Sequence, residues 1–267
     1  MDGDAFDEAL SEDPDAALGL LAELAGATDA RLRELARQLA GRVLVRVGRA
    51  GPPRAAGVGR MQAARWAEGG DLDIDSSLEE IIGARVANRP LDLESMRARR
   101  WARPATAICL LIDRSGSMGG QRLASAALAA AAVAWRAPDD YSVVAFSDEA
   151  VVVKAQDEIR PVEAVVDDLL CLRGHGTTNL DLALTVARSQ LDRSSAKDRL
   201  VLLLSDGRPT AGADPVGAAR ALERLLVLAP AGDAREATAL ARAAGGRAVE
   251  LGGPSTVPSA LAALIGG

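Results

Sequence analysis

Apolar runs of strand length alternate with helical segments through the second half of the chain, and this alternation limits the possible folds most. Six strands are expected, at residues 106–113, 141–147, 151–154, 200–205, 225–228 and 247–251. Six helices are expected at residues 121–135, 161–171, 180–191, 215–223, 233–244 and 257–265. Such alternation builds βαβ units, with helices on both faces of a mostly parallel sheet. We therefore predict an α/β, doubly wound, six-stranded sheet, with strand 151–154 as the antiparallel edge or its partner.

The first hundred residues have a different pattern. Leucines at helical spacing predict two helices between residues 14 and 47, separated near Gly26. The remaining expected elements are a loop rich in Gly and Pro, a short helix and a second helix, at residues 48–59, 61–66 and 76–86. Asp75 or Ser76 is the expected N-cap of that last helix. We therefore divide the chain into a helical N-terminal segment, residues 1–104, and an α/β domain, residues 105–267.

Composition narrows the class of protein. The formal net charge is -6, whereas a nucleic-acid-binding protein needs a basic face, so no nucleic-acid partner is expected. The first fifteen residues are acidic and lack the basic start and apolar run of a signal peptide. The Ala-rich run from Leu123 to Trp135 is shorter than the roughly 18 apolar residues that a membrane span requires. We therefore expect a cytoplasmic protein with no membrane span.

Carboxylates and hydroxyls follow three of the predicted strand ends and helix starts. The first strand ends in Asp113, with Ser115 and Ser117 after it, and a second apolar strand ends just before Asp206. Thr178 lies in a glycine-containing loop that opens a helix. In open α/β sheets, ligands bind beyond the carboxyl ends of the strands. These hard oxygen donors favour Mg²⁺, Mn²⁺ or Ca²⁺ over zinc or copper.

The three motifs together resemble the von Willebrand factor A (VWA) family. They read Asp-x-Ser-x-Ser, then Gly-x-Gly-Thr-Thr-Asn-Leu, then Leu-Ser-Asp-Gly, and the resemblance covers about residues 106–265. It implies a metal-ion-dependent adhesion site (MIDAS) at Asp113, Ser115, Ser117, Thr178 and Asp206. Thr178 is preferred to Thr177 because the family's threonine usually precedes Asn or Pro and an apolar residue.

In that family the serines, and often the threonine, bind the metal directly, while the two aspartates often act through water. The resemblance therefore implies a Mg²⁺ site, or one for Mn²⁺ or Ca²⁺. It also implies that one coordination position stays free for an Asp or Glu of a partner.

A narrower resemblance rests on the acidic stretch Asp71-Leu72-Asp73-Ile74-Asp75-Ser76-Ser77-Leu78 and the arginines that precede the metal loop. These features look like bacterial VWA proteins that work beside MoxR-type AAA+ ATPases, including the type that matures carbon-monoxide dehydrogenase. The resemblance implies a non-enzymatic, metal-dependent adaptor for metallocofactor insertion or complex remodelling. The alternatives are a subunit of a magnesium or cobalt chelatase-type enzyme and a stand-alone protein-binding module.

Catalytic interpretations are weaker. A triad of Ser115, His175 and Asp206 can be written, but the serine lacks a G-x-S-x-G elbow. Neither Lys154 nor Lys197 follows a phosphate-binding loop, so we expect any ATPase to be a separate protein. No catalytic residue is therefore predicted.

The acidic stretch itself has three interpretations. As a phosphatase nucleophile loop it should end an apolar strand, yet two glycines precede it. As an EF-hand loop it lacks the glycine at the sixth position, which is Ser76, and the glutamate at the twelfth, which is Ile82. We therefore expect an acidic helix N-cap, favoured by the helix dipole.

Overall fold

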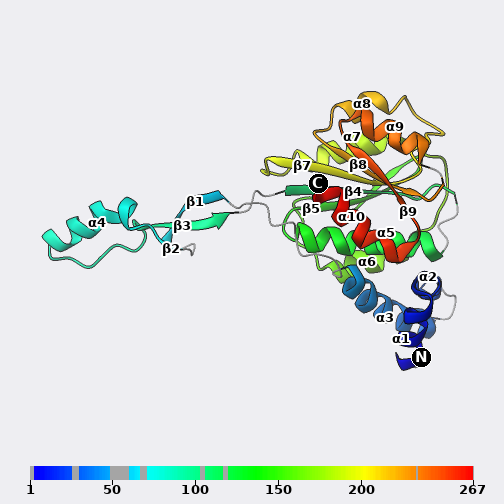
Figure 1. Ribbon diagram of the computed structural model, residues 1–267, viewed down its shortest axis with the longest axis horizontal. Coiled ribbons are helices and arrows are strands. Elements are labelled where there is room, and N and C mark those ends of the chain that lie inside the picture. Colours follow the sequence, from blue (N-terminus) through cyan, green and yellow to red (C-terminus); the bar gives the residue numbers. More distant parts are fainter. Residues whose placement is uncertain are drawn as a thin grey trace. The chain divides into compact units, whose positions relative to one another are not determined.

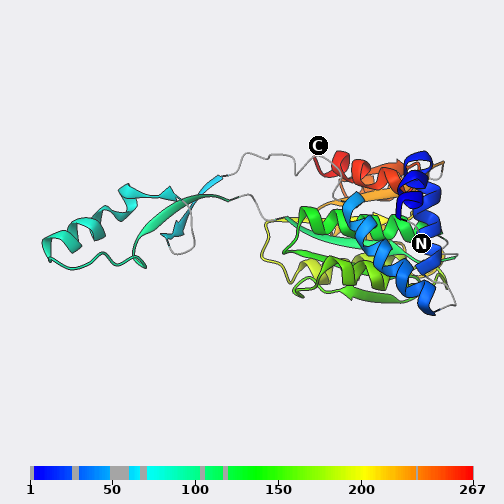
Figure 2. The same ribbon diagram turned by 90° about the horizontal axis from the view of Figure 1, so that it is seen from below.

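The computed structural model describes residues 3–25, 30–48, 60–66, 71–102, 106–116, 120–232 and 234–266 (Figures 1 and 2). Internal contacts divide the chain into two compact units. The sheet unit combines Met1–Ala55 with Ala105–Gly267, and the inserted unit is Ala56–Pro104. The sequence predicted one boundary near residue 104. The structure differs because the first helices of the chain pack on the α/β domain and therefore belong to the sheet unit.

The sheet unit is built on a six-stranded sheet in the order β6-β5-β4-β7-β8-β9. Its strands are β4 (Thr106–Asp113), β5 (Tyr141–Phe146), β6 (Ala150–Lys154), β7 (Asp198–Leu204), β8 (Leu225–Pro230) and β9 (Arg247–Leu251). Edge strand β6 runs antiparallel to β5, and the other strand pairs are parallel. The predicted α/β fold with a mostly parallel sheet is therefore confirmed.

Two cores lie on the two faces of this sheet, because successive side chains of a strand point to opposite faces. On β4, Ile108, Leu110 and Ile112 enter one core, while Cys109 and Leu111 enter the other. Helices that cover the first face are α5 (Gly120–Arg136), α6 (Val162–Leu170) and α10 (Val257–Gly266), which follows the short helix η2 (Pro254–Thr256). Helices that cover the second are α7 (Leu180–Leu191), α8 (Val216–Arg220) and α9 (Arg235–Ala243).

A further layer of helices covers α5 on its outer side (Figure 2). These helices are α1 (Gly3–Glu12), α2 (Pro14–Ala25) and α3 (Ala30–Gly48); α1 was not predicted from the sequence. Because α5 is enclosed between the sheet and this layer, it is apolar nearly all round. Small side chains allow the close approach, since a Cβ at Gly48 would lie 2.7 Å from the Ala131 Cβ. Among the described residues, no helix is long and apolar enough to cross a membrane.

The inserted unit is a small antiparallel sheet with one helix. Its strands, in the order β1-β3-β2, are β1 (Arg60–Arg65), β2 (Asp71–Leu72) and β3 (Arg97–Ala102), and its helix is α4 (Ile74–Val86). The helix predicted at residues 61–66 is therefore wrong, because residues 60–65 form a strand that pairs with β3. Arg60 lies opposite Ala102, and Arg65 lies opposite Arg97.

The predicted N-cap of the helix in the inserted unit also needs correction. Asp73 caps α4, since its carboxylate accepts a hydrogen bond from the Ser76 backbone N–H at 3.2 Å and from the Ser76 hydroxyl at 2.8 Å. The acidic stretch therefore does serve as a helix N-cap, but two or three residues earlier than expected.

Candidate metal centre

Three loops meet at the carboxyl edge of the sheet, where β4 and β7 end side by side. Ile112 pairs with Leu204 across the two parallel strands, so Asp113 and Ser205 leave the sheet together. The hydroxyl of Ser205 donates a hydrogen bond of 2.7 Å to Asp113 Oδ2. The third loop precedes α7 and brings Thr178, whose hydroxyl donates to the Ser115 hydroxyl at 2.7 Å.

The structure thus brings together Asp113, Ser115 and Thr178, and Asp206 follows Ser205 directly. Asp206 lines the same cavity as Asp113 and Ser115. Ser117, the remaining predicted ligand, lies outside the described residues. Four of the five predicted positions are therefore placed at one edge of the sheet.

Both oxygens of the Asp113 carboxylate accept hydrogen bonds within the protein. Oδ1 accepts from the Ser115 backbone N–H at 2.9 Å, and Oδ2 accepts from Ser205. Ser205 is 5% exposed, and its oxygen also accepts from the Gly207 backbone N–H at 3.1 Å. These bonds fix the orientation of the carboxylate. Ser205 is therefore a positioning residue that our sequence reasoning missed, although it stands inside the Leu-Ser-Asp-Gly motif.

Thr178 is buried and held from two sides. Its backbone N–H donates to the Thr210 hydroxyl at 2.8 Å, and its carbonyl accepts from the Thr210 N–H at 3.0 Å. The next residue, Asn179, caps α7 by accepting from the Leu182 N–H at 3.1 Å. Thr210 was also missed by sequence reasoning, because nothing in its loop distinguishes it from other turn residues.

Asp206 occupies a tight turn after β7. Its Oδ1 accepts from the Arg208 backbone N–H at 2.9 Å. The following Gly207 has a φ of +78°, and a Cβ there would lie 2.6 Å from the backbone of Ala237 in α9. Only glycine fits both the left-handed conformation and this contact, so the Gly of the motif sets the direction of the aspartate.

His175 lies near the rim of the site and interacts with Arg114. The backbone N–H of His175 donates to the Arg114 carbonyl at 3.1 Å, and its ring lies 3.3 Å from Arg114 Nη1. Within the described part of the chain, no hydrogen bond joins the His175 ring to Ser115 or Asp206. The arrangement therefore lacks the contact between nucleophile and base on which a catalytic triad depends.

A further carboxylate, Asp148, lies on the same rim. The Ser147 hydroxyl donates to it at 2.9 Å and is the main reason that its pKa lies below the usual range. Electrostatic interactions with His175 and Arg114 lower the pKa of Asp148 further. The rim consequently carries an ionised carboxylate next to two nitrogen-bearing side chains.

A cavity of about 310 Å³ opens beside the site. Asp113, Ser115 and Asp206 form part of its wall. The ends of β4, β7 and β9 contribute Ile112, Leu204, Ser205 and Leu251. The start of α5, the end of β8 and the loop after β9 contribute Gln121, Arg122, Ser125, Pro230, Ala231, Gly252, Gly253 and Pro254. The candidate metal centre therefore borders a space large enough for side chains of a bound protein segment.

The oxygen donors at this edge fit a divalent cation. Adjacent ligands of an octahedral Mg²⁺ lie roughly 2.9 Å apart when its bonds are about 2.1 Å long, and the Ser115 and Thr178 hydroxyl oxygens are 2.7 Å apart. Among the described residues, no group of three or more His, Cys, Asp and Glu side chains converges. A site of hydroxyls with two carboxylates, as found here, offers a divalent cation such as Mg²⁺ the hard oxygen ligands that it prefers.

Comparison with known proteins agrees with this geometry. The family described as VWA domain containing CoxE-like protein matches residues 47–255. Inter alpha-trypsin inhibitor heavy chain 4 from mouse is 31% identical over 119 residues, which are 39% of this chain and 12% of that protein. Human inter-alpha-trypsin inhibitor heavy chain H6 is 31% identical over 120 residues, which are 39% of this chain and 9% of that protein. The chain thus spans about a tenth of the length of these curated relatives.

Among solved structures, proximal thread matrix protein 1 from the mussel byssus is similar in fold, with a TM-score of 0.51 and 16% identity over 60% of this chain and 47% of that chain. A second structure of that mussel protein, with a TM-score of 0.50 and 15% identity over the same shares, has zinc in its MIDAS motif.

Proposed function

This chain belongs to the CoxE-like family of VWA-domain proteins, and on that basis we propose that it is a metal-dependent protein-binding adaptor of a MoxR-type AAA+ ATPase. Its role is metallocofactor insertion or complex remodelling in the cytoplasm. The observation that carries the proposal is the paired Ser115 and Thr178 hydroxyls beside the Asp113 carboxylate, which Ser205 holds in place.

Asp113, Ser115, Ser117, Thr178 and Asp206 hold the metal in this proposal. The hard oxygen donors favour Mg²⁺, with Mn²⁺ or Ca²⁺ as substitutes. The zinc-occupied MIDAS of the mussel protein supports a divalent cation at this position of the fold. When bound, the cation supplies a Lewis-acidic contact for a carboxylate of another protein.

A partner's Asp or Glu completes the site. Asp113 accepts two hydrogen bonds from its own chain, one on each carboxylate oxygen, and these keep it oriented at the wall of the cavity. The residues that flank the partner's carboxylate enter the neighbouring cavity, where the exposed Arg122 forms part of the wall. Binding is therefore directed towards an acidic segment.

The proposed role requires no catalysis by this chain. VWA domains are in general interaction modules, and His175 contacts Arg114 rather than a candidate nucleophile. The separate AAA+ ATPase supplies the energy for remodelling. The alternative function, that of a chelatase subunit, can be distinguished by assay, because it would require insertion of Mg²⁺ or Co²⁺ into a tetrapyrrole.

The proposal is tested by replacing Asp113 with alanine in the purified full chain. We expect Asp113→Ala to lose Mn²⁺ binding, measured by electron paramagnetic resonance, and to retain the circular dichroism spectrum of the wild type. In a pull-down from native lysate, an AAA+ ATPase should be retained by wild type with Mg²⁺, and neither after EDTA treatment nor by Asp113→Ala.

Asp157→Ala is the matched control, since Asp157 is an exposed aspartate paired with Arg193 away from the carboxyl edge of the sheet. It should behave as wild type in both assays. Retention of the same proteins regardless of metal and of Asp113 would place the docking surface elsewhere and refute the adaptor mechanism.

A further inference from the structure

Helix α4 of the inserted unit exposes most of its large apolar side chains, and only Ile81 among them is partly buried. The side chains it buries are small, with Ser77 at 1% and Ala84 at 2% exposure. Its exposed residues include Ile74 at 59%, Ile82 at 52% and Val86 at 82%. An ordinary amphipathic helix buries its large apolar residues and exposes its polar ones, so the pattern of α4 is the reverse.

Hydrogen bonds fix this reversed orientation. The Ser77 hydroxyl accepts from the Arg97 backbone N–H at 2.9 Å and lies 3.3 Å from the Arg97 carbonyl, to which it donates. Asp73, which caps the helix, donates its own N–H to the Arg97 carbonyl at 2.9 Å. The face of α4 towards β3 thus contains Ser77 and Ala84 beside the partly buried Ile81, and rotation of the helix would break the hydrogen bonds of Ser77.

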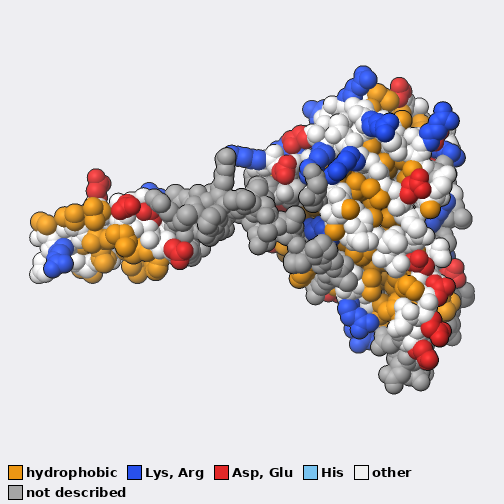
Figure 3. Space-filling model, in the orientation of Figure 1, with side chains coloured by type: hydrophobic (Ala, Val, Ile, Leu, Met, Phe, Trp, Pro, Cys, Tyr) orange, Lys and Arg blue, Asp and Glu red, His pale blue; other side chains and the backbone are white. Residues whose placement is uncertain are grey.

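The exposed apolar residues form one continuous stripe along the helix, which we call the α4 stripe: Ile74, Leu78, Ile82 and Val86. Residues four apart lie above one another on a helix surface. Figure 3 shows apolar side chains gathered on the part of the inserted unit where Figure 1 places α4. Contiguous apolar surface of this kind marks an interaction site, whereas single exposed apolar residues are ordinary.

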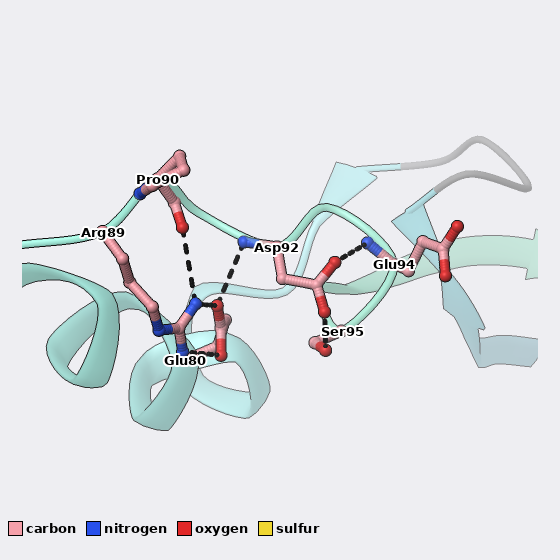
Figure 4. A network of polar contacts seen from close by, with 6 residues as sticks. All are labelled: Glu80, Arg89, Pro90, Asp92, Glu94 and Ser95. Atoms are coloured by element: carbon pink, nitrogen blue, oxygen red, sulfur yellow. Dashed lines mark hydrogen bonds and ion pairs between the residues drawn. The ribbon is translucent and has the colours of Figure 1, made fainter. Parts of the chain in front are cut away.

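Charge around the α4 stripe selects the kind of partner. Helix α4 carries three acidic side chains, Asp75, Glu79 and Glu80, and one basic side chain, Arg85. Glu80 already pairs with Arg89 through hydrogen bonds of 2.7 and 2.9 Å (Figure 4), so the exposed Asp75 and Glu79 remain for a partner. A second copy of this surface would bring acidic side chains against acidic ones, which disfavours self-association.

We propose that the α4 stripe is a docking surface for an amphipathic helix of another protein, with an apolar face bordered by Lys and Arg. Apolar residues of that helix pack between the side chains of the stripe, as in other helix-in-groove interfaces. Its basic margin pairs with the exposed Asp75 and Glu79. This surface belongs to the inserted unit, so the protein has two binding sites of different chemistry.

The test measures binding of a synthetic peptide to the full chain by fluorescence anisotropy. The probe is a short amphipathic helix with leucines on one face and lysines at its margins, compared with the same peptide carrying glutamates there. We expect the lysine peptide to bind at least about tenfold more tightly than the glutamate peptide, and its affinity to fall as salt rises.

The variant Leu78→Gln/Ile82→Gln should weaken binding of the lysine peptide at least about tenfold. Ile159→Gln is the matched control, because Ile159 is a fully exposed isoleucine of the sheet unit. It should bind as wild type. Since the stripe is exposed, both proteins should keep their circular dichroism spectra.

Three outcomes would overturn the proposal. Equal binding of the two peptides would show that charge does not select the partner. Unchanged binding by the double variant would show that the α4 stripe is not the docking surface. Sedimentation velocity supplies the third: a wild-type dimer that Leu78→Gln/Ile82→Gln converts to a monomer would identify a second copy as the occupant.

Discussion

The sheet unit and the inserted unit differ in where they place their large apolar side chains. In the sheet unit, Leu111 and Leu202 are fully buried, and polar residues gather in loops at the carboxyl edge of the sheet. In the inserted unit, Ser77 and Ala84 are buried while Leu78 is half exposed. The first unit therefore stabilises itself and presents a polar site, whereas the second keeps its apolar surface for another molecule.

The largest effect that tests this contrast is expected in the centre of the sheet. Leu111 lies on β4 with no exposed surface. Leu111→Ala should lower the free energy of unfolding by about 3 kcal/mol, because it removes buried methyl groups and leaves a cavity. Urea unfolding of the full chain measures this change, and a loss below about 1 kcal/mol would show that the core is loosely packed.

A smaller effect is expected at the polar edge. Ser205→Ala removes the hydroxyl that orients Asp113. Loss of such an outer partner typically weakens metal affinity about 10-fold to 100-fold, so we expect at least tenfold weaker Mn²⁺ binding by titration calorimetry. Ser259→Ala removes an exposed hydroxyl that bonds to the Thr256 carbonyl, and it serves as the control. Equal Mn²⁺ affinities for the two variants would mean that Ser205 does not position the site.

The inserted unit should show a pH-dependent contact near the end of α4. The hydrogen bonds and charge of Arg89, with the Asp92 N–H, lower the pKa of Glu80 to about 2 from its ordinary 4.5. A carboxyl whose pKa is lowered by folding stabilises the fold above pH 4.5, and that contribution disappears as the pH falls through about 2. The carboxyl ¹³C shift of Glu80 should therefore titrate near pH 2, whereas a midpoint near 4.5 would show that the ion pair does not form.

The smallest effect is expected on the α4 stripe. Leu78→Ala should change the free energy of unfolding by less than about 0.5 kcal/mol, since surface substitutions rarely do more. It is the counterpart of Leu111→Ala, with the same chemical change at an exposed position. A loss as large as that of Leu111→Ala would show that the stripe is packed in the isolated chain, and the contrast between the two units would fail.

Local sequence patterns were sufficient for much of the α/β domain, residues 105–267. Strands β4 and β9 and helix α7 begin and end where the sequence predicted, because the residue pattern typical of a strand or a helix continues without a break along each of them. The ends of parallel strands share one edge, so motif order alone predicted that Asp113, Ser115 and Asp206 would meet.

Long-range packing was not visible in the sequence. Strand β1 forms only because β3, more than thirty residues later, pairs with it, whereas the local pattern of residues 61–66 suits a helix equally well. The leucines of α2 indicate an apolar face, but nothing local says that this face covers α5. Ser205 was missed for a related reason, since its role depends on the neighbouring strand.

One hydrogen bond has a consequence for how the protein is made. Asp15 in α2 accepts from the Ser255 backbone N–H at 2.7 Å, across 240 positions of the chain. On the ribosome, the sheet unit cannot reach its final packing until residue 255 has emerged, while the inserted unit is complete once Pro104 has emerged. The α4 stripe is therefore presented on the nascent chain first, and protease treatment of stalled chains would reveal this order.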